Sequence, residues 1–260
     1  MLLTVDAGNT NICLAVYENN ELLYAARIYT EIRKTSDQYA YDFKQILTEK
    51  YSDPSLYRGA VISSVVPEIT KKLEYAAAFI TGKKPVVLGV GVKTGLQVNV
   101  VNRGELGADL VAGAVGAKQK YPMPCLIWDM GTCTKISVLN EKGEYMGCTI
   151  SPGVRMCIEA LGSNTSQLNQ IAISDYERPF GNTTATAISS GVIVGTAVML
   201  EGLTDRIIKD MGFENPTIVA TGGCAGYVLP GVTKDVIFDP ELVSRGLRAV
   251  FEYNAEAGNA

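Results

Sequence analysis

Asp6-Ala7-Gly8-Asn9-Thr10 follows the first apolar run of this 260-residue chain, and Asp129-Met130-Gly131-Thr132-Cys133-Thr134 follows another apolar run at its midpoint. A second strand-like run comes after the glycine of each copy. Each copy therefore predicts a strand, a tight turn and a second strand. A carboxylate at a strand end can hold a cation, glycine lets a ligand approach the backbone, and Asn or Thr groups can bind phosphate oxygens. Two such turns facing each other predict one nucleotide held between two half-molecules.

The repetition carries this argument, because a single Asp-x-Gly turn would more often do no more than close a hairpin. Each copy leads into a predicted hairpin, with Asn19-Asn20 as the turn of the first and Lys142-Gly143 as the turn of the second. Since the whole pattern occurs twice in the same context, phosphate binding is favoured over two ordinary hairpins.

Beyond the hairpins, strand-like apolar runs alternate with helical segments. Helices are predicted over residues 36–51, 69–81, 104–120 and 192–211 and from residue 240 onward, and strands over residues 59–66, 85–88 and 216–220. Strands that first form hairpins and then alternate with helices are typical of an α/β chain with mixed sheets. We therefore expect two similar halves, residues 1–118 and residues 119–260.

The composition excludes several classes of function. The net charge is −4 and Lys and Arg are scattered, which predicts no binding to nucleic acid. The first residues show no basic segment followed by a cleavage site, so we expect no export signal and a cytoplasmic location. Residues 181–200 carry no charge and are long enough to cross a bilayer, but seven of them are Asn, Thr or Ser. This composition predicts a buried helix and no membrane span.

Cysteine and histidine usage narrows the chemistry further. The six cysteines include no Cys-x-x-Cys pair and lie mostly in apolar segments, so we expect buried, reduced thiols. The chain has no histidine, which excludes Ser-His-Asp and Cys-His machinery and zinc held by histidine. Any proton transfer would fall to a carboxylate, Lys, Tyr or Cys.

Asp109 is the candidate for that proton transfer, because it stands where a helix of small residues begins and runs to Lys120. It could be a first-turn carboxylate stabilised by the helix dipole, or it could orient a hydroxyl for phosphoryl transfer. The residues alone leave both roles open. Two further turns, Ser151-Pro152-Gly153 and Thr221-Gly222-Gly223, follow predicted strands and could line a nucleotide site, although each is a weak signal alone.

Together these motifs resemble the type III pantothenate kinases in order and approximate spacing over nearly the whole chain. The motifs are Asp6-x-Gly-Asn-Thr, Ser63-Ser64-Val65-Val66-Pro67, Gly107-Ala108-Asp109, Asp129-x-Gly-Thr, Ser151-Pro152-Gly153, residues 181–191 and Thr221-Gly222-Gly223. That family belongs to the actin, sugar kinase and Hsp70 superfamily. The resemblance implies two actin-like, ribonuclease H-like halves with mixed sheets and an ATP cleft between them. It also implies ATP-dependent phosphorylation of the terminal hydroxyl of pantothenate, the first step of coenzyme A biosynthesis.

The resemblance implies roles for individual residues. ATP would be bound by Asp6, Ala7, Gly8, Asn9, Thr10, Asn11, Ile12, Cys13 and Thr132. Asp6 would also hold a divalent cation such as Mg²⁺, and Asp129 would hold a monovalent cation, K⁺ or NH₄⁺. Pantothenate would contact Val100, Gly107, Ala108, Asp109, Leu110 and Thr184, with Asp109 as the proton acceptor. A homodimer is implied as well, for which the helices of small residues could supply the interface.

Several positions depart from the family pattern. The arginine that usually follows the Gly-x-Asp motif is Leu110 here, a common tyrosine is Val100, and a downstream proline is replaced in the Arg103-Gly104 region. Asn182 is displaced by one position from the family's Gly-x-Asn-Thr stretch. Since hydrogen bonds to charged groups contribute about 1.5–3 kcal/mol each, these changes predict weaker pantothenate binding unless another residue such as Arg103 or Arg155 substitutes. The alternatives are a nucleotide-binding paralogue with a regulatory role and a kinase for another small alcohol.

Overall fold

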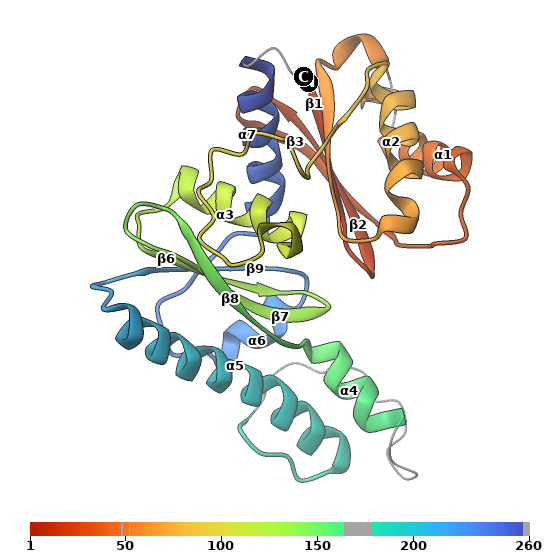
Figure 1. The fold of residues 1–260 in the computed structure, drawn as a ribbon. Helices are drawn as coiled ribbons and strands as arrows, with labels where there is room; N and C mark the ends of the chain where they lie inside the picture. Colours follow the sequence, from red (N-terminus) through yellow and green to blue (C-terminus); the bar gives the residue numbers. More distant parts are fainter. Residues whose placement is uncertain (48, 52, 164–177, 257–260) are drawn as a thin grey trace. The chain divides into compact units, whose positions relative to one another are not determined.

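The computed structural model describes residues 1–47, 49–51, 53–163 and 178–256, which form two compact units (Figure 1). Unit 1 contains Met1–Gln97, Val101–Lys120 and Glu241–Ala260, and unit 2 contains Val98–Val100 and Tyr121–Pro240. Each unit is built on its own five-stranded mixed sheet. The predicted α/β class with mixed sheets is confirmed.

The sheet of unit 1 has the strand order β3-β2-β1-β4-β5. Its strands are β1 (Leu2–Ala7), β2 (Asn11–Glu18), β3 (Glu21–Tyr29), β4 (Gly59–Ser64) and β5 (Val86–Val87). The helices of this unit are α1 (Ser36–Ile46), α2 (Pro67–Thr81), α3 (Ala108–Lys120) and α7 (Leu242–Glu256). Figure 1 shows α1 and α2 on one side of this sheet and α3 and α7 on the other. Because β1 is central, its alternate side chains are buried on both faces, with Leu3 against α1 and α2 and Leu2 against α3 and α7.

Small residues let α3 and α7 pack at close range. A Cβ atom at Gly246 of α7 would lie 1.7 Å from the Ala112 carbonyl oxygen of α3, and one at Gly116 of α3 would lie 2.2 Å from the Leu242 carbonyl oxygen. The small-residue composition of the helix that begins at Ala108 is therefore explained by helix packing.

Unit 2 repeats the arrangement with the strand order β10-β9-β6-β7-β8. Its strands are β6 (Cys125–Met130), β7 (Cys133–Leu139), β8 (Tyr145–Pro152), β9 (Thr217–Thr221) and β10 (Ile237–Phe238). Its helices are α4 (Val154–Ser163), α5 (Thr184–Met211) and the short α6 (Ala225–Val228). In both units the first strand of the repeat pairs antiparallel with the second strand and parallel with a later strand. The strand-turn-strand repeat predicted from the sequence is confirmed.

The two predicted hairpin turns are also present. Asn19 adopts a positive φ of 52° between β2 and β3, and Gly143 adopts a φ of 68° between β7 and β8. Asn and Gly are the residue types that tolerate this conformation best, which explains why these dipeptides were informative.

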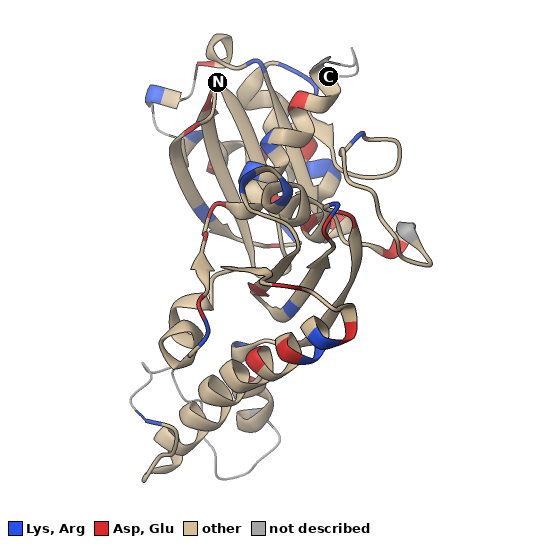
Figure 2. Cartoon of the chain, turned by 90° about the vertical axis from the view of Figure 1, so that its left-hand side faces the viewer, with Lys and Arg blue, Asp and Glu red and all other residues tan. Residues whose placement is uncertain are grey.

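Helix α5 contains most of the uncharged stretch noted in the sequence. It starts with a capping box between Thr183 and Thr186 and ends at Gly212, which has a left-handed conformation. By length and composition it is the one helix in the described part of the chain that could cross a membrane, and 28% of its most apolar window is buried. Its charged residues all lie near its C-terminal end (Figure 2).

One face of α5 packs into the core of unit 2. Ile193, Ala197 and Leu200 are buried there, and the Trp128 indole nitrogen donates a hydrogen bond of 2.9 Å to the Thr204 hydroxyl. The helix is thus buried along one face, whereas the sequence predicted a buried helix without specifying a face.

The last helix differs from the predicted division at residue 119. Residues 119–260 were expected to form the second half, but α7 packs against α3, β1 and β4 and belongs to unit 1. The short segment Val98–Val100 belongs to unit 2, where Val98 pairs with Tyr145 at the edge of β8.

Candidate active site

The first phosphate turn joins β1 to β2 and is held by backbone hydrogen bonds. The Gly8 amide donates to the Asn11 carbonyl oxygen at 2.9 Å, which closes the turn. From the end of β3, the Thr30 hydroxyl donates to the Gly8 carbonyl oxygen at 2.7 Å, and the Thr30 amide donates to the Thr10 carbonyl oxygen at 3.0 Å. Asn9, Thr10 and Asn11 are exposed, so the turn is fixed from behind while these side chains face solvent. Sequence reasoning missed Thr30, although a polar residue just after β3 was a usable signal.

Asp6 ends β1 between two polar neighbours in register with it. Cys13 of β2 pairs with Asp6 on one side, and Ser63 of β4 pairs with it on the other. Burial raises the pKa of the Cys13 thiol, and the nearby Asp6 carboxylate raises it further. Ser63 is completely buried, and among the described residues its hydroxyl makes no hydrogen bond. The end of β1 therefore places a carboxylate between a thiol and a hydroxyl, and Arg27 of β3 lies on the far side of the thiol.

Asp109 lies in the first turn of α3. Its Oδ1 accepts a hydrogen bond of 2.9 Å from the Leu110 amide. A Cβ atom at Gly107 would lie 2.5 Å from that same oxygen and 3.8 Å from the Val65 Cγ1 atom. The Val65 amide in turn donates to the Ala7 carbonyl oxygen at 3.0 Å. Gly107, which leaves room for the carboxylate, therefore lies near both Asp109 and Val65, and Val65 is hydrogen-bonded to the end of the strand that leads into the first phosphate turn.

The second phosphate turn lies in unit 2 and is held by two other glycine motifs. The Gly131 amide donates to the Cys133 carbonyl oxygen at 3.0 Å, and the Gly153 amide donates to the Thr132 carbonyl oxygen at 3.1 Å. A Cβ atom at Gly153 would lie 2.3 Å from the Thr132 oxygen, and one at Gly222 would lie 2.5 Å from the Met130 carbonyl carbon. Gly222 also has a φ of 97°, which disfavours any side chain. Three motifs that are far apart in sequence thus meet at one turn.

Asp129 has a cationic partner in this unit. Lys135 stands opposite Asp129 in the antiparallel register of β6 and β7, and its Nζ lies 3.0 Å from the Asp129 Oδ2. The lysine side chain is 14% exposed and the aspartate side chain 23% exposed. Among the described residues there is no group of three or more His, Cys, Asp or Glu that could hold a metal. The Asp129 Oδ2 atom is therefore already paired with a positive charge from the chain itself. Lys135 was not singled out in the sequence, although pairing the strands across the turn would have placed it opposite Asp129.

The residues predicted to contact the substrate are found in both units. Gly107, Ala108, Asp109 and Leu110 are in unit 1, and Val100 and Thr184 are in unit 2. The neighbour of Val100, Asn99, is fixed to β8 because its amide donates to the Tyr145 carbonyl oxygen at 2.8 Å. Thr184 is the exposed first residue of α5, and with Gly181 and Asn182 it lines a hollow of about 870 Å³. Arg155 is exposed near the start of α4, whereas the side chain of Arg103 lies outside the described residues.

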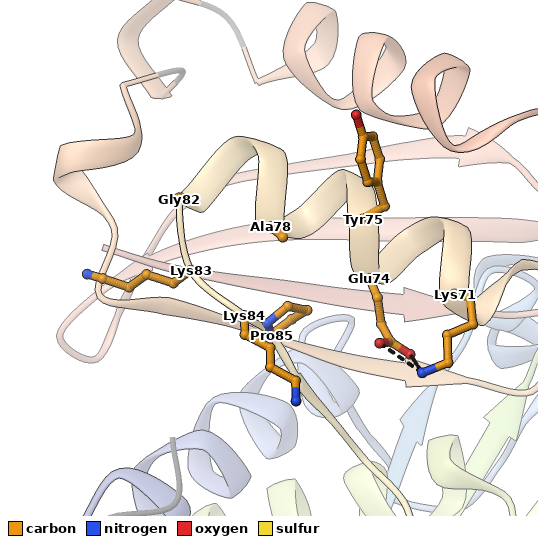
Figure 3. Close-up of a pocket in the computed structure, with 8 residues that line it drawn as sticks. All are labelled: Lys71, Glu74, Tyr75, Ala78, Gly82, Lys83, Lys84 and Pro85. Atoms are coloured by element: carbon orange, nitrogen blue, oxygen red, sulfur yellow. Dashed lines mark hydrogen bonds and ion pairs between the residues drawn. The ribbon is translucent and has the colours of Figure 1, made fainter.

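A second hollow lies in unit 1 and contains none of the predicted site residues (Figure 3). It has a volume of about 480 Å³ and is lined by Lys71, Glu74, Tyr75, Ala78, Gly82, Lys83, Lys84 and Pro85. The Lys71 Nζ forms an ion pair of 2.8 Å with Glu74, and the Lys83 Nζ donates to the Tyr57 carbonyl oxygen at 2.6 Å. Two of its lysines are thus engaged within the unit, and no nucleotide motif adjoins it.

The repeated mixed sheets have the fold of the actin-like ATPases and sugar kinases. The hexokinase of the ROK group from Thermus thermophilus superposes with a TM-score of 0.54 at 13% sequence identity, covering 99% of each chain. The activator of 2-hydroxyisocaproyl-CoA dehydratase from Clostridium difficile, solved with bound ADPNP, superposes with a TM-score of 0.56 at 11% identity, covering 100% of this chain and 97% of that one. At such low identities the likeness shows the fold alone.

Sequence comparison identifies the family within this class. The family model described as type III pantothenate kinase matches residues 2–206. A protein named type III pantothenate kinase from Moorella thermoacetica is 35% identical over 254 residues, which cover 98% of this chain and 100% of that protein. The chain belongs to the type III pantothenate kinase family.

Proposed function

We propose that this protein is an ATP-dependent pantothenate kinase. It transfers the γ-phosphoryl group of ATP to the terminal hydroxyl of pantothenate and forms 4′-phosphopantothenate, the first step of coenzyme A biosynthesis. The observation that carries the proposal is the family match over residues 2–206 in a chain that retains both phosphate turns and Asp109. The hexokinase-like fold supports phosphoryl transfer to an alcohol, and the ADPNP bound by one structural relative supports nucleotide binding.

The ATP phosphates are bound by the first turn, residues Asp6, Ala7, Gly8, Asn9, Thr10, Asn11, Ile12 and Cys13, together with Thr132. Asp6 fits a role as a ligand of Mg²⁺, because this ion is usually held by one or two carboxylates together with phosphate oxygens and water. The ion supplies neutralisation of the phosphate charge. The Thr30 and Gly8 hydrogen bonds keep the turn in one conformation, so little reorganisation is needed when ATP binds.

Asp109 acts on the acceptor alcohol. We propose that its carboxylate accepts a hydrogen bond from the terminal hydroxyl of pantothenate and takes the proton as the phosphoryl group is transferred. Because the transition state of phosphoryl transfer is loose, orienting the hydroxyl in line with the γ-phosphate contributes more than strong base chemistry. Its position in the first turn of α3 supports this role, because the neighbouring Gly107 lies near Val65, which is hydrogen-bonded to Ala7 just before the first phosphate turn.

Gly107, Ala108, Leu110, Val100 and Thr184 complete the proposed pantothenate contacts. Leu110 provides no cation for the substrate carboxylate, so another group takes that role, and Arg155 is exposed at α4. This departure also favours the two alternatives, a kinase for another small alcohol and a regulatory paralogue that binds nucleotide.

Charge distribution and helix packing bear on where the enzyme acts and on how it assembles. We propose that it is cytoplasmic and acts without nucleic acid or membrane, since acidic and basic residues are interspersed along the chain (Figure 2) and one face of α5 packs into the core. We also propose a homodimer. Helix α5 presents Ala187, Gly191, Gly195 and Val198 at helical spacing on an exposed face, which suits close approach of a second helix. A positive charge beside Asp129, from a monovalent cation or from Lys135, is part of the proposed site.

The test is ADP release by the purified chain with ATP and Mg²⁺, measured with and without pantothenate. The proposal expects ADP release that requires pantothenate and a product heavier than pantothenate by one phosphoryl group. ADP release with another small alcohol but not with pantothenate would replace the substrate. ATP binding without ADP release for any alcohol would instead support the regulatory paralogue.

A further inference from the structure

We infer that Lys135 supplies, in this chain, the positive charge beside Asp129 that a bound monovalent cation would otherwise supply. Turnover then needs neither potassium nor ammonium ions. The inference rests on the proposed function, because it concerns the nucleotide site of the same kinase, and it assigns to Lys135 a positioning role in that site.

The position of the lysine is fixed by the sheet. Asp129 is the fifth residue of β6, Lys135 is the third residue of β7, and the antiparallel register sets them directly opposite each other. Side chains of directly opposed residues lie on the same face of a sheet, so the ion pair follows from the backbone pairing. The separation of 3.0 Å between the Lys135 Nζ and the Asp129 Oδ2 is the contact that a bound cation would otherwise make.

Both partners are shielded from solvent. With exposures of 14% and 23%, the two charges are screened less by salt than an ion pair on the surface. The ammonium is also tethered, so it occupies its place at any salt concentration and has no need to be captured from solution. A dissolved ion would have to displace a covalently attached competitor of equal charge.

Unit 1 shows what the same position looks like without the lysine. There the residue opposite the repeat aspartate is Cys13, which pairs with Asp6 as Lys135 pairs with Asp129. A cysteine side chain carries no positive charge in either protonation state, whereas a lysine side chain does. At the position opposite the repeat aspartate, the second turn therefore carries its own cation and the first turn does not. The two halves differ in charge at one equivalent position.

The experiment compares the full-length protein with Lys135→Gln, Lys135→Arg and the control Lys142→Gln. Lys142 is an exposed residue of the turn after β7, so its replacement removes the same charge from the same hairpin away from Asp129. Each protein is assayed for pantothenate-dependent ADP release in KCl, NH₄Cl, NaCl and choline chloride at one ionic strength. Thermal unfolding without substrates is recorded in the same four salts.

Wild type, Lys142→Gln and Lys135→Arg are expected to show turnover in choline chloride within about twofold of that in KCl, as for a site whose charge is already in place. Lys135→Gln is expected to lose at least about tenfold in choline chloride and to recover in KCl or NH₄Cl. Its unfolding temperature is expected to rise in KCl or NH₄Cl relative to choline chloride by a few degrees, about what ligand binding produces. A merely structural lysine would give no rescue by small cations.

Two results would overturn the inference. The first is a turnover or an unfolding temperature of the wild-type protein that is clearly higher in KCl or NH₄Cl than in choline chloride. The second is a folded Lys135→Gln variant whose turnover and unfolding temperature are the same in all four salts. If Lys135→Gln does not fold, the salt response of wild type and Lys135→Arg decides the matter alone. If no protein turns over pantothenate, the proposed function fails, and the substrate-free unfolding data still test the lysine.

Discussion

Replacement of Gly153 by alanine should damage the second phosphate turn while leaving the rest of unit 2 in place. The new Cβ atom would lie 2.3 Å from the Thr132 carbonyl oxygen and 2.6 Å from the Gly131 carbonyl oxygen, whereas ordinary contacts begin at 3.4 Å. Both obstacles are backbone atoms, so no side chain can rotate away. Either the turn or the start of α4 must move by about 1 Å.

The size of the effect follows from that displacement. Overpacking of this kind costs about 1–3 kcal/mol, which should lower the unfolding temperature by several degrees. A misplacement of about 1 Å in a positioning element can reduce reactivity by about a hundredfold, so kcat/KM for ATP should fall by about ten- to a hundredfold. Steady-state kinetics with varied ATP and thermal unfolding measure the two effects on the same preparation.

The matched control for this experiment is Gly226→Ala. Gly226 lies in α6 of the same unit, and nothing is within 4 Å of the position of its missing Cβ atom. This variant should keep both the unfolding temperature and the kinetics of wild type. If Gly153→Ala also kept the unfolding temperature and the kinetics of wild type, the Gly131-Thr132 turn would not be packed against Gly153. The account of how the three motifs meet would then be refuted.

Three further changes test other parts of the structure. Gly246→Ala places a Cβ atom 1.7 Å from the Ala112 carbonyl oxygen, so it should lower the free energy of unfolding in urea by at least about 1–3 kcal/mol. The control Gly202→Ala, whose added Cβ atom meets open space, should cause no such loss. A wild-type free energy of unfolding for Gly246→Ala would refute the close packing of α3 and α7. Leu110→Arg should lower the KM for pantothenate by roughly ten- to a hundredfold, because a charged hydrogen bond contributes about 1.5–3 kcal/mol; an unchanged KM would mean that residue 110 does not reach the substrate carboxylate. Burial raises the pKa of the Cys125 thiol from 9.0 to about 12, so the unfolded chain loses this proton at lower pH than the folded chain. The free energy of unfolding should therefore fall as the pH rises from 9 toward 12, and Cys125→Ala should reduce that fall. If the free energy of unfolding of wild type and of Cys125→Ala depended on pH in the same way, burial would not be raising the pKa of the Cys125 thiol.

Local features of the fold could be predicted from the sequence because local chemistry determines them. Asn19 and Gly143 tolerate positive φ, so the two hairpin turns were recognisable. The repeated Asp-x-Gly pattern predicted both strand-turn-strand units, and the structure confirms them. The membership of α7 in unit 1 was not predictable in this way, because it depends on contact between Gly246 and Ala112, which are far apart in the chain.

In the candidate site, too, the local motifs could be predicted from the sequence, whereas the contacts that depend on strand pairing could not. The Ser151-Pro152-Gly153 and Thr221-Gly222-Gly223 turns were expected near a nucleotide, but the carbonyl groups they contact depend on how β8 is placed beside β7 and β9 beside β6. Lys135 was missed because its place opposite Asp129 depends on the register of β6 and β7 and not on a sequence motif. The roles assigned to Asp6, Thr132 and Asp109 stay predictions until they are measured.

The most direct test of the central claim is ADP release with ATP, Mg²⁺ and pantothenate by wild type, Asp109→Asn and Glu105→Gln. Glu105 is an exposed carboxylate in the 3₁₀ turn just before α3, so its replacement controls for loss of charge in that region. The account predicts turnover by wild type and Glu105→Gln and a loss of about a hundredfold or more in Asp109→Asn, with ATP affinity unchanged. Wild-type turnover by Asp109→Asn would contradict the assignment of Asp109 as the group that orients the acceptor hydroxyl.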